Sequence, residues 1–207
     1  MAAWIEMVAL FEKGGLVMPL LLAGSVLAVA VAVERFRVFG RATDGMATFR
    51  EQLAEKLTEG DLAAALELSC QYQNLSAVVA AAGLSRLERG SRAMELVMEE
   101  TANRGAARLR QRLDLLSLMV TMAPLLGLLG TVVGMIRAFN VLNVSSGQPF
   151  AITGGVGEAL VATAAGLCVA ILALSLLSYF RMRLDAVLGD LEETAALVLE
   201  AALEQAG

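Results

Sequence analysis

Three stretches of the chain carry very few charged residues, and each is long enough to cross a membrane. They cover residues 14–33, 115–139 and 154–180. A bilayer core of about 30 Å is spanned by roughly 20 helical residues, and a helix satisfies its own backbone hydrogen bonds in lipid. The pattern therefore predicts an all-α integral membrane protein with three transmembrane helices.

The segments between these spans are more polar and are also expected to be helical where apolar positions recur. Met46, Phe49, Leu53 and Leu57 follow helical spacing, and Asp61 is placed to cap the next helix. No strong helix breaker lies between residue 92 and the second span, so we expect one helix over 92–139. The third span should continue as a helix into the tail. The complete division is a short outer segment 1–13, span 14–33, a helical loop 34–114, span 115–139, an outer turn 140–153, span 154–180 and a C-terminal helix 181–207.

The basic residues indicate the orientation of the three spans. Most of the 16 lysines and arginines lie between the first two spans, and Arg181 and Arg183 follow the third. Lys13 and Arg137 flank the spans at their other ends. Because cytoplasmic loops are enriched in Lys and Arg, we expect the loop and the C-terminus in the cytoplasm and the N-terminus outside.

Composition narrows the classes of function. Hydrophobic residues make up 57% of the chain and the mean hydropathy is +0.68, which is too apolar for a soluble protein of this length. A net charge of -5 without a basic patch argues against nucleic-acid binding. The chain has two cysteines and no histidine, so we expect no metal site and no cofactor. The loop contains no nucleophile–base set, so we do not expect an enzyme.

Small residues form a stripe along the second span and another along the third. They recur at three- or four-residue steps and so fall near one face of each helix. Small residues on one face allow another helix backbone to approach closely, so we expect the two spans to pack on each other. The stripe residues are Ala123, Gly127, Gly130 and Gly134 in the second span, and Ala159, Ala162, Gly166 and Ala170 in the third.

Polar side chains accompany both stripes. Thr131 and Thr163 are each expected roughly 12 to 14 Å below the outer surface, and Glu158 lies nearer that surface. Either threonine could instead bond a carbonyl of its own helix, and Glu158 could simply pair with Arg137. Since no acidic residue lies at the centre of any span, the chain either moves no ions or receives the central carboxylate from a partner.

Three motifs carry a family resemblance. APLLGLLGTVVGMIRAF (123–139) resembles the second span of the MotA/TolQ/ExbB proton-channel family, and GGVGEALVATAAGLCVAILAL (154–174) resembles the third. VAVERF (31–36) is similar to the end of the first span. The three-span layout resembles the ExbB/TolQ branch more than the four-span flagellar stator branch.

The resemblance implies a multi-pass protein of the bacterial inner membrane that forms a pentamer among membrane lipids. The pentamer would surround an ExbD/TolR-like single-span protein whose aspartate carries protons, and would work with a TonB- or TolA-like protein. Thr131, Thr163 and Glu158 would then line the ion pathway. The family usually has a proline after the position of Ile171, where this chain has Leu172. ExbB-like and TolQ-like roles, proton and sodium, and a structural scaffold without its own ion pathway stay open as alternatives.

Overall fold

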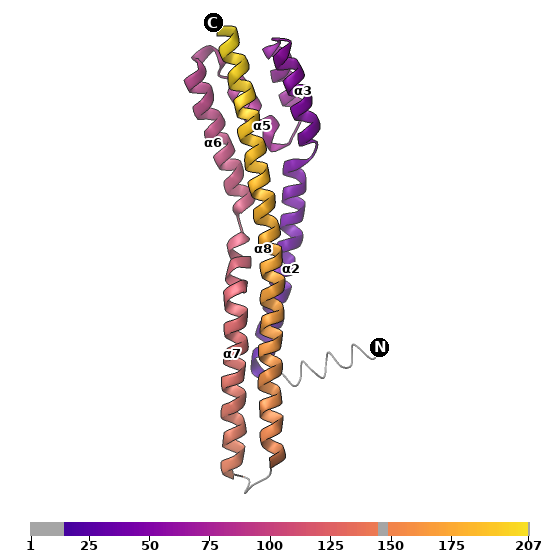
Figure 1. The fold of residues 1–207 in the computed structure, drawn as a ribbon, viewed down its shortest axis with the longest axis vertical. Coiled ribbons are helices and arrows are strands. Elements are labelled where there is room, and N and C mark those ends of the chain that lie inside the picture. The colour runs from indigo at the N-terminus through magenta and orange to yellow at the C-terminus, as the bar shows by residue number, and fades with distance from the viewer. Residues whose placement is uncertain (1–14, 145–148, 207) are drawn as a thin grey trace, which may run out of the picture. The chain divides into compact units, whose positions relative to one another are not determined.

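The computed structural model describes residues 15–144 and 149–206, and these residues form helices without any strand (Figure 1). Three helical stretches, which include α2, α7 and α8, are long and apolar enough to cross a membrane. This confirms the predicted all-α membrane fold. The helices are the 3₁₀ turn η1 (Gly15–Val17), α2 (Met18–Thr43), α3 (Met46–Thr58), α4 (Leu62–Gln71), α5 (Leu75–Leu84), the 3₁₀ turn η2 (Leu87–Arg89), α6 (Ser91–Arg110), α7 (Leu113–Val144) and α8 (Pro149–Ala206).

The chain divides into two compact units, each built from two separate segments. The membrane unit comprises the described residues of 1–32 and 112–178. The second unit comprises those of 33–111 and 179–207. Helices α2 and α8 each contribute residues to both units.

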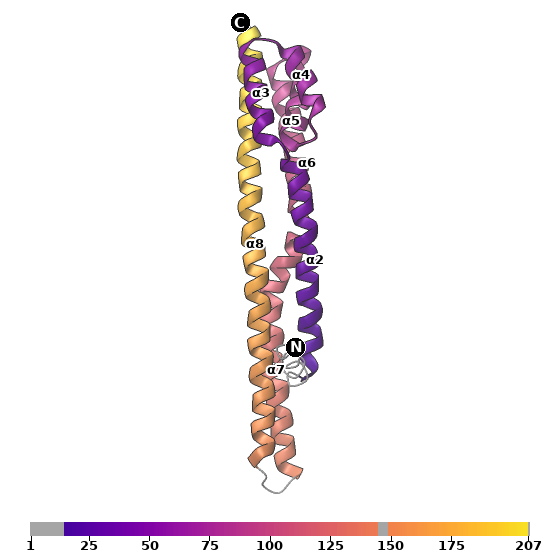
Figure 2. The same cartoon turned by 90° about the vertical axis from the view of Figure 1, so that its right-hand side faces the viewer.

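In the membrane unit, α7 and α8 run side by side in both views (Figures 1 and 2). The start of α2 packs on this pair, where Val17 and Leu21 share a buried core with Ala123 and Ala170. Other faces of the helices carry exposed apolar side chains, a surface suited to lipid or to another apolar helix. These side chains include Leu125, Leu128, Val132, Ile136, Leu160 and Ile171.

The second unit is a set of short helices with an apolar interior. Phe49 and Leu53 of α3 are fully buried, as the helical spacing predicts. The Asp61 carboxylate accepts a hydrogen bond from the Ala64 amide at 2.9 Å, which confirms the predicted cap of α4. Asn74 caps α5 in the same way through the Ala77 amide.

The prediction of one helix over 92–139 is wrong. Helix α6 ends at Arg110 and α7 begins at Leu113, and Arg112 between them adopts a φ of 62°. A left-handed residue cannot continue a right-handed helix, so the backbone of Arg112 itself makes the break. In contrast, α8 continues without interruption through Gly189 to Ala206, as predicted for the tail.

The helices also reach further toward each other than the predicted spans. Helix α7 extends to Val144 and α8 starts at Pro149, so both enter the segment 140–153 that the sequence assigns to a turn. The predicted outer segment 1–13 lies outside the described residues.

Candidate functional site

The two small-residue stripes meet at the interface between α7 and α8. A side-chain carbon placed on Gly166 would lie 2.6 Å from the Ala123 carbonyl oxygen and 3.0 Å from the Gly127 Cα. One placed on Gly127 would lie 3.1 Å from the Thr163 Cα. Both approaches are to backbone atoms, so only glycine fits at these positions without moving a helix.

The remaining stripe residues continue the same interface in both directions. A side-chain carbon on Gly130 would lie 2.5 Å from the Ala162 Cβ, and one on Gly134 would lie 3.1 Å from the Ala159 Cβ. Ala170 belongs to the core shared with η1 and α2. The facing pairs run in opposite directions along the two helices, so α7 and α8 are antiparallel.

This register brings the two threonines to the same part of α7. The Thr163 hydroxyl donates a hydrogen bond across the interface to the Gly127 carbonyl at 3.1 Å. The Thr131 hydroxyl donates to the Leu128 carbonyl of its own helix at 2.6 Å. The two hydroxyls therefore bond to consecutive carbonyls of α7. Thr163 makes the interhelical bond, whereas Thr131 bonds locally.

Glu158 lies where three helical elements meet. Its carboxylate accepts a hydrogen bond from the Arg137 guanidinium of α7 at 3.2 Å, and these side chains are 26% and 51% exposed, respectively. Gly15, at the start of η1, has a φ of +66°, and a side chain there would collide with the Glu158 carboxylate. Glu158 is thus held by a cation and approached by the beginning of the first membrane helix.

Sequence patterns did not identify two features of this site. The Gly127 carbonyl is a hydrogen-bond acceptor at the interface, and the backbone of Gly15 adjoins Glu158. A carbonyl has no residue-type signal, and the contact with Gly15 depends on how η1 folds onto α8. Thr121 of α7 bonds within its own helix, to the Leu118 carbonyl at 3.0 Å.

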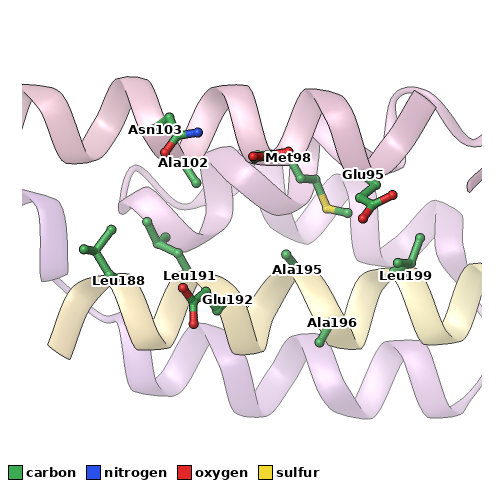
Figure 3. Close-up of a pocket in the computed structure, with 11 residues that line it drawn as sticks. Glu95, Met98, Ala102, Asn103, Leu188, Leu191, Glu192, Ala195, Ala196 and Leu199 are labelled. Atoms are coloured by element: carbon green, nitrogen blue, oxygen red, sulfur yellow. The ribbon is translucent and has the colours of Figure 1, made fainter. Parts of the chain in front are cut away.

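A groove of about 430 Å³ lies between α6 and α8 in the second unit (Figure 3). Figure 3 shows Met98 of α6 opposite Leu191 and Ala195 of α8. Its acidic members are Glu95, Glu99 and Glu192. Across the part of the chain that the structure describes, no group of three His, Cys, Asp or Glu residues is placed to hold a metal ion. The groove thus offers helix-packing surface, and the polar chemistry of interest lies between α7 and α8.

Comparison with known proteins identifies the family. The model of the MotA/TolQ/ExbB proton channel family matches residues 71–193, which is more than half of the 207-residue chain. The chain belongs to this family. The matched region contains Thr131, Thr163 and Glu158, together with both small-residue stripes.

Relatives of known name place the chain near the ExbB/TolQ branch. It is 39% identical over 169 residues to an ExbB-like biopolymer transport protein of Synechocystis, covering 79% of this chain and 66% of that protein. It is 28% identical over 210 residues to the Tol-Pal system protein TolQ of Haemophilus influenzae, covering 92% and 90%. An ExbB homologue of Methanothermobacter thermautotrophicus is 29% identical over 185 residues, covering 88% and 66%.

The chain thus spans slightly less than two thirds of the Synechocystis and Methanothermobacter relatives and most of the length of TolQ. The membrane helices and the family match together support a multi-pass membrane protein of the ExbB/TolQ type.

Proposed function

We propose that this chain is the proton-pathway subunit of an inner-membrane motor that converts ion-motive force into mechanical work. The observation that carries the proposal is the Thr163 hydroxyl of α8, which bonds across the tightly packed interface to α7, with the more exposed Thr131 hydroxyl bonded to the next carbonyl of α7. Polar groups inside membrane helices are costly and commonly mark ion routes. Membership of the MotA/TolQ/ExbB family supports the same function.

The proton carrier is supplied by a second protein. Glu158 is the acidic residue nearest the threonines in the spans, and its carboxylate is already paired with Arg137. A pathway that needs a titrating group deep in the membrane therefore needs one from outside this chain. An ExbD/TolR-like single-span protein with a membrane aspartate fits this role.

In the complete assembly, five copies of the chain would surround the partner helices in the inner membrane. The N-terminus would lie in the periplasm, and the loop and C-terminus in the cytoplasm, in line with the distribution of basic residues. Work would reach the periplasm through a TonB- or TolA-like protein, and the named relatives include both ExbB-like proteins and TolQ. The chain itself would perform no enzymatic reaction.

The proposal is tested by proton flux into liposomes that contain the chain together with an ExbD/TolR-like single-span protein. A membrane potential is imposed and a pH-sensitive dye reports the flux. We expect Thr163→Val and Thr131→Val each to lower the flux about three- to tenfold, the effect of losing a hydrogen bond in the pathway. Thr121→Val is the matched control, because its hydroxyl bonds to Leu118 elsewhere on α7.

The competing function is a structural scaffold whose hydroxyls only pack. It predicts normal flux in both threonine variants, with loss of assembly only when Gly130 or Gly134 is replaced by a bulky residue. Wild-type liposomes without partner-dependent flux, or threonine variants with unchanged flux, would refute the pathway.

A further inference from the structure

One face of α2 changes from apolar to basic within a single turn. Its exposed apolar residues recur at steps of three or four positions, so they share that face. Arg37 follows directly and is also exposed on this side of the helix. Apolar side chains, then an aromatic ring, then a cation is the order found where a helix leaves the bilayer hydrocarbon for the headgroups. The apolar residues are Val26, Val29, Val33 and Phe36.

An aromatic contact joins this face of α2 to α8. The ring centroids of Phe36 and Tyr179 are 5.3 Å apart, and those of Phe39 and Phe180 are 5.6 Å apart. Residue numbers rise together in the two contacts, so the helices run in the same direction here. Phe36 and Tyr179 remain 48% and 38% exposed, so one side of their contact is open. Arg183 lies four residues beyond Tyr179, one turn further along the same face of α8.

Gly40 leaves open space at the level of the two arginines. It lies four residues beyond Phe36, so it is one turn past the aromatic contact, as Arg183 is on α8. A side-chain carbon placed on Gly40 would have no atom within 4 Å. Arg37 lies three residues before Gly40 on the same face of α2. Two cations from different helices therefore flank a place that the protein leaves unfilled.

Nearby carboxylates do not neutralise these cations. Within residues 15–144 and 149–206, neither Arg37 nor Arg183 forms an ion pair or a side-chain hydrogen bond. Glu34, which precedes Arg37 by three residues, accepts a hydrogen bond from the Arg35 guanidinium at 2.9 Å. Asp185 is two residues from Arg183, so it points about 200° away around α8. Two guanidinium groups thus remain available to an anion.

We propose that Phe36, Arg37, Gly40, Tyr179 and Arg183 form an aromatic–arginine patch that binds an anionic phospholipid. Each guanidinium presents paired N–H donors that match phosphate oxygens. The headgroup phosphate occupies the open space at Gly40, and an acyl chain lies along the exposed valines of α2. Basic pockets between membrane helices recognise anionic lipid headgroups by the same chemistry.

The order of the side chains favours a lipid over a soluble anion or a second copy of the chain. A soluble anion needs only the two arginines, and the valines and rings beside them would contribute nothing. A second copy would have to bring an acidic side chain and an apolar surface together in matching register. A phospholipid carries the phosphate and the apolar chain in one molecule, in the order in which α2 presents arginine and valine. This site needs neither a partner protein nor proton flux, so it holds or fails independently of the proposed function.

The site is tested by native mass spectrometry of the chain in detergent, titrated separately with dioleoylphosphatidylglycerol and dioleoylphosphatidylcholine. Both lipids have a phosphate and the same acyl chains, but only phosphatidylglycerol is anionic, and we expect it to bind more tightly. Arg37→Gln and Arg183→Gln should each weaken its binding about fivefold, through the loss of one cation beside the phosphate. Gly40→Leu should also weaken it, because the added side chain fills the open space without changing the charge.

Arg89→Gln is the matched control for the loss of charge. Arg89 is exposed and precedes α6, whose other end supplies the Arg108 carbonyl that bonds to Arg35. The length of α6 places Arg89 roughly 30 Å from that end, so this variant should bind phosphatidylglycerol like the wild type.

Four outcomes would overturn the inference. Equal affinity for the two lipids would mean that the headgroup charge is not recognised. Equal losses in Arg89→Gln and Arg37→Gln, or no loss in Gly40→Leu, would show a general attraction of charge without a site. Displacement of the lipid by millimolar inorganic phosphate would identify a site for soluble anions. A larger assembly that binds no lipid and dissociates in the arginine variants would make the patch an interface between copies of the chain.

Discussion

At the scale of single residues, Glu158 forms an ion pair that joins two membrane helices. Its carboxylate is bonded to Arg137 of α7 and adjoins the backbone of Gly15. An ion pair this exposed contributes modestly to stability in water. A carboxylate that loses its cation among packed helices is more costly, because the charge is left without compensation. The two partners should therefore respond differently to neutralisation.

We expect Arg137→Gln to lower the free energy of unfolding by about 1 kcal/mol, because it leaves the Glu158 carboxylate, 26% exposed, without its guanidinium. Glu158→Gln should be milder, since the amide oxygen can still accept a hydrogen bond from Arg137. Thermal unfolding of the purified chain in detergent measures both effects.

The double variant Arg137→Gln with Glu158→Gln decides the cause. If the lone carboxylate is the problem, the double variant is more stable than Arg137→Gln alone. Equal or additive losses would show that the guanidinium stabilises the chain through other contacts.

At the scale of elements, most helices could be predicted because their signals are local. The buried positions of α3 follow from helical spacing, and Asp61 precedes α4 as a cap should. The packing of α7 on α8 could also be predicted, because small residues such as Gly127 and Gly166 recur on one face of each helix. Patterns of this kind depend only on neighbours within a few residues.

The features that could not be predicted depend on contacts between distant residues. Thr131 and Thr163 have the same side chain and similar surroundings in sequence, but only Thr163 bonds across the interface. Which one does so depends on the register of α7 against α8. The break at Arg112 could not be predicted from the sequence either, since neither glycine nor proline occurs between residues 106 and 123.

The break between α6 and α7 can be tested by comparing glycine with alanine at position 112. A continuous helix and the observed break predict opposite orders of stability for these two variants. In a continuous helix, alanine is more stable than glycine by about 1 kcal/mol. At the φ of 62° that Arg112 adopts, glycine is favoured, because left-handed backbone costs other residues roughly 1–2 kcal/mol. We therefore expect Arg112→Gly to unfold at a higher temperature than Arg112→Ala.

Both variants lack the arginine side chain, so its own interactions cancel in the comparison. Gly189→Ala is the control, because here alanine should stabilise the chain relative to glycine. Gly189 lies inside α8, and a side-chain carbon added there would have no atom within 4 Å. Alanine should be the more stable residue there. Greater stability of Arg112→Ala than of Arg112→Gly would mean that α6 and α7 form one helix.

At the scale of the whole molecule, each unit is completed by a segment from far along the chain. In the second unit, the Arg50 guanidinium of α3 bonds to Asp190 at 2.7 Å and Glu193 at 2.6 Å. Phe180 is fully buried and its ring contacts Phe39 at 5.6 Å between centroids. The tail is therefore part of the interior of the second unit, and the loop should depend on it.

Removal of residues 179–207 should open the loop, because burial of α8 residues such as Leu191 and Val198 would be lost. Limited trypsin digestion of the chain in detergent measures this, since cleavage follows local opening. Arg50→Ala should raise the cleavage rate about fivefold, the equivalent of 1 kcal/mol, and truncation should raise it further. Arg92→Ala is the matched control, because Arg92 pairs with Glu95, one turn away in the same helix. If the truncated chain resists trypsin as well as the full chain does, then the loop folds without the tail. In that case the folding of the second unit does not depend on α8, the helix that also carries Thr163.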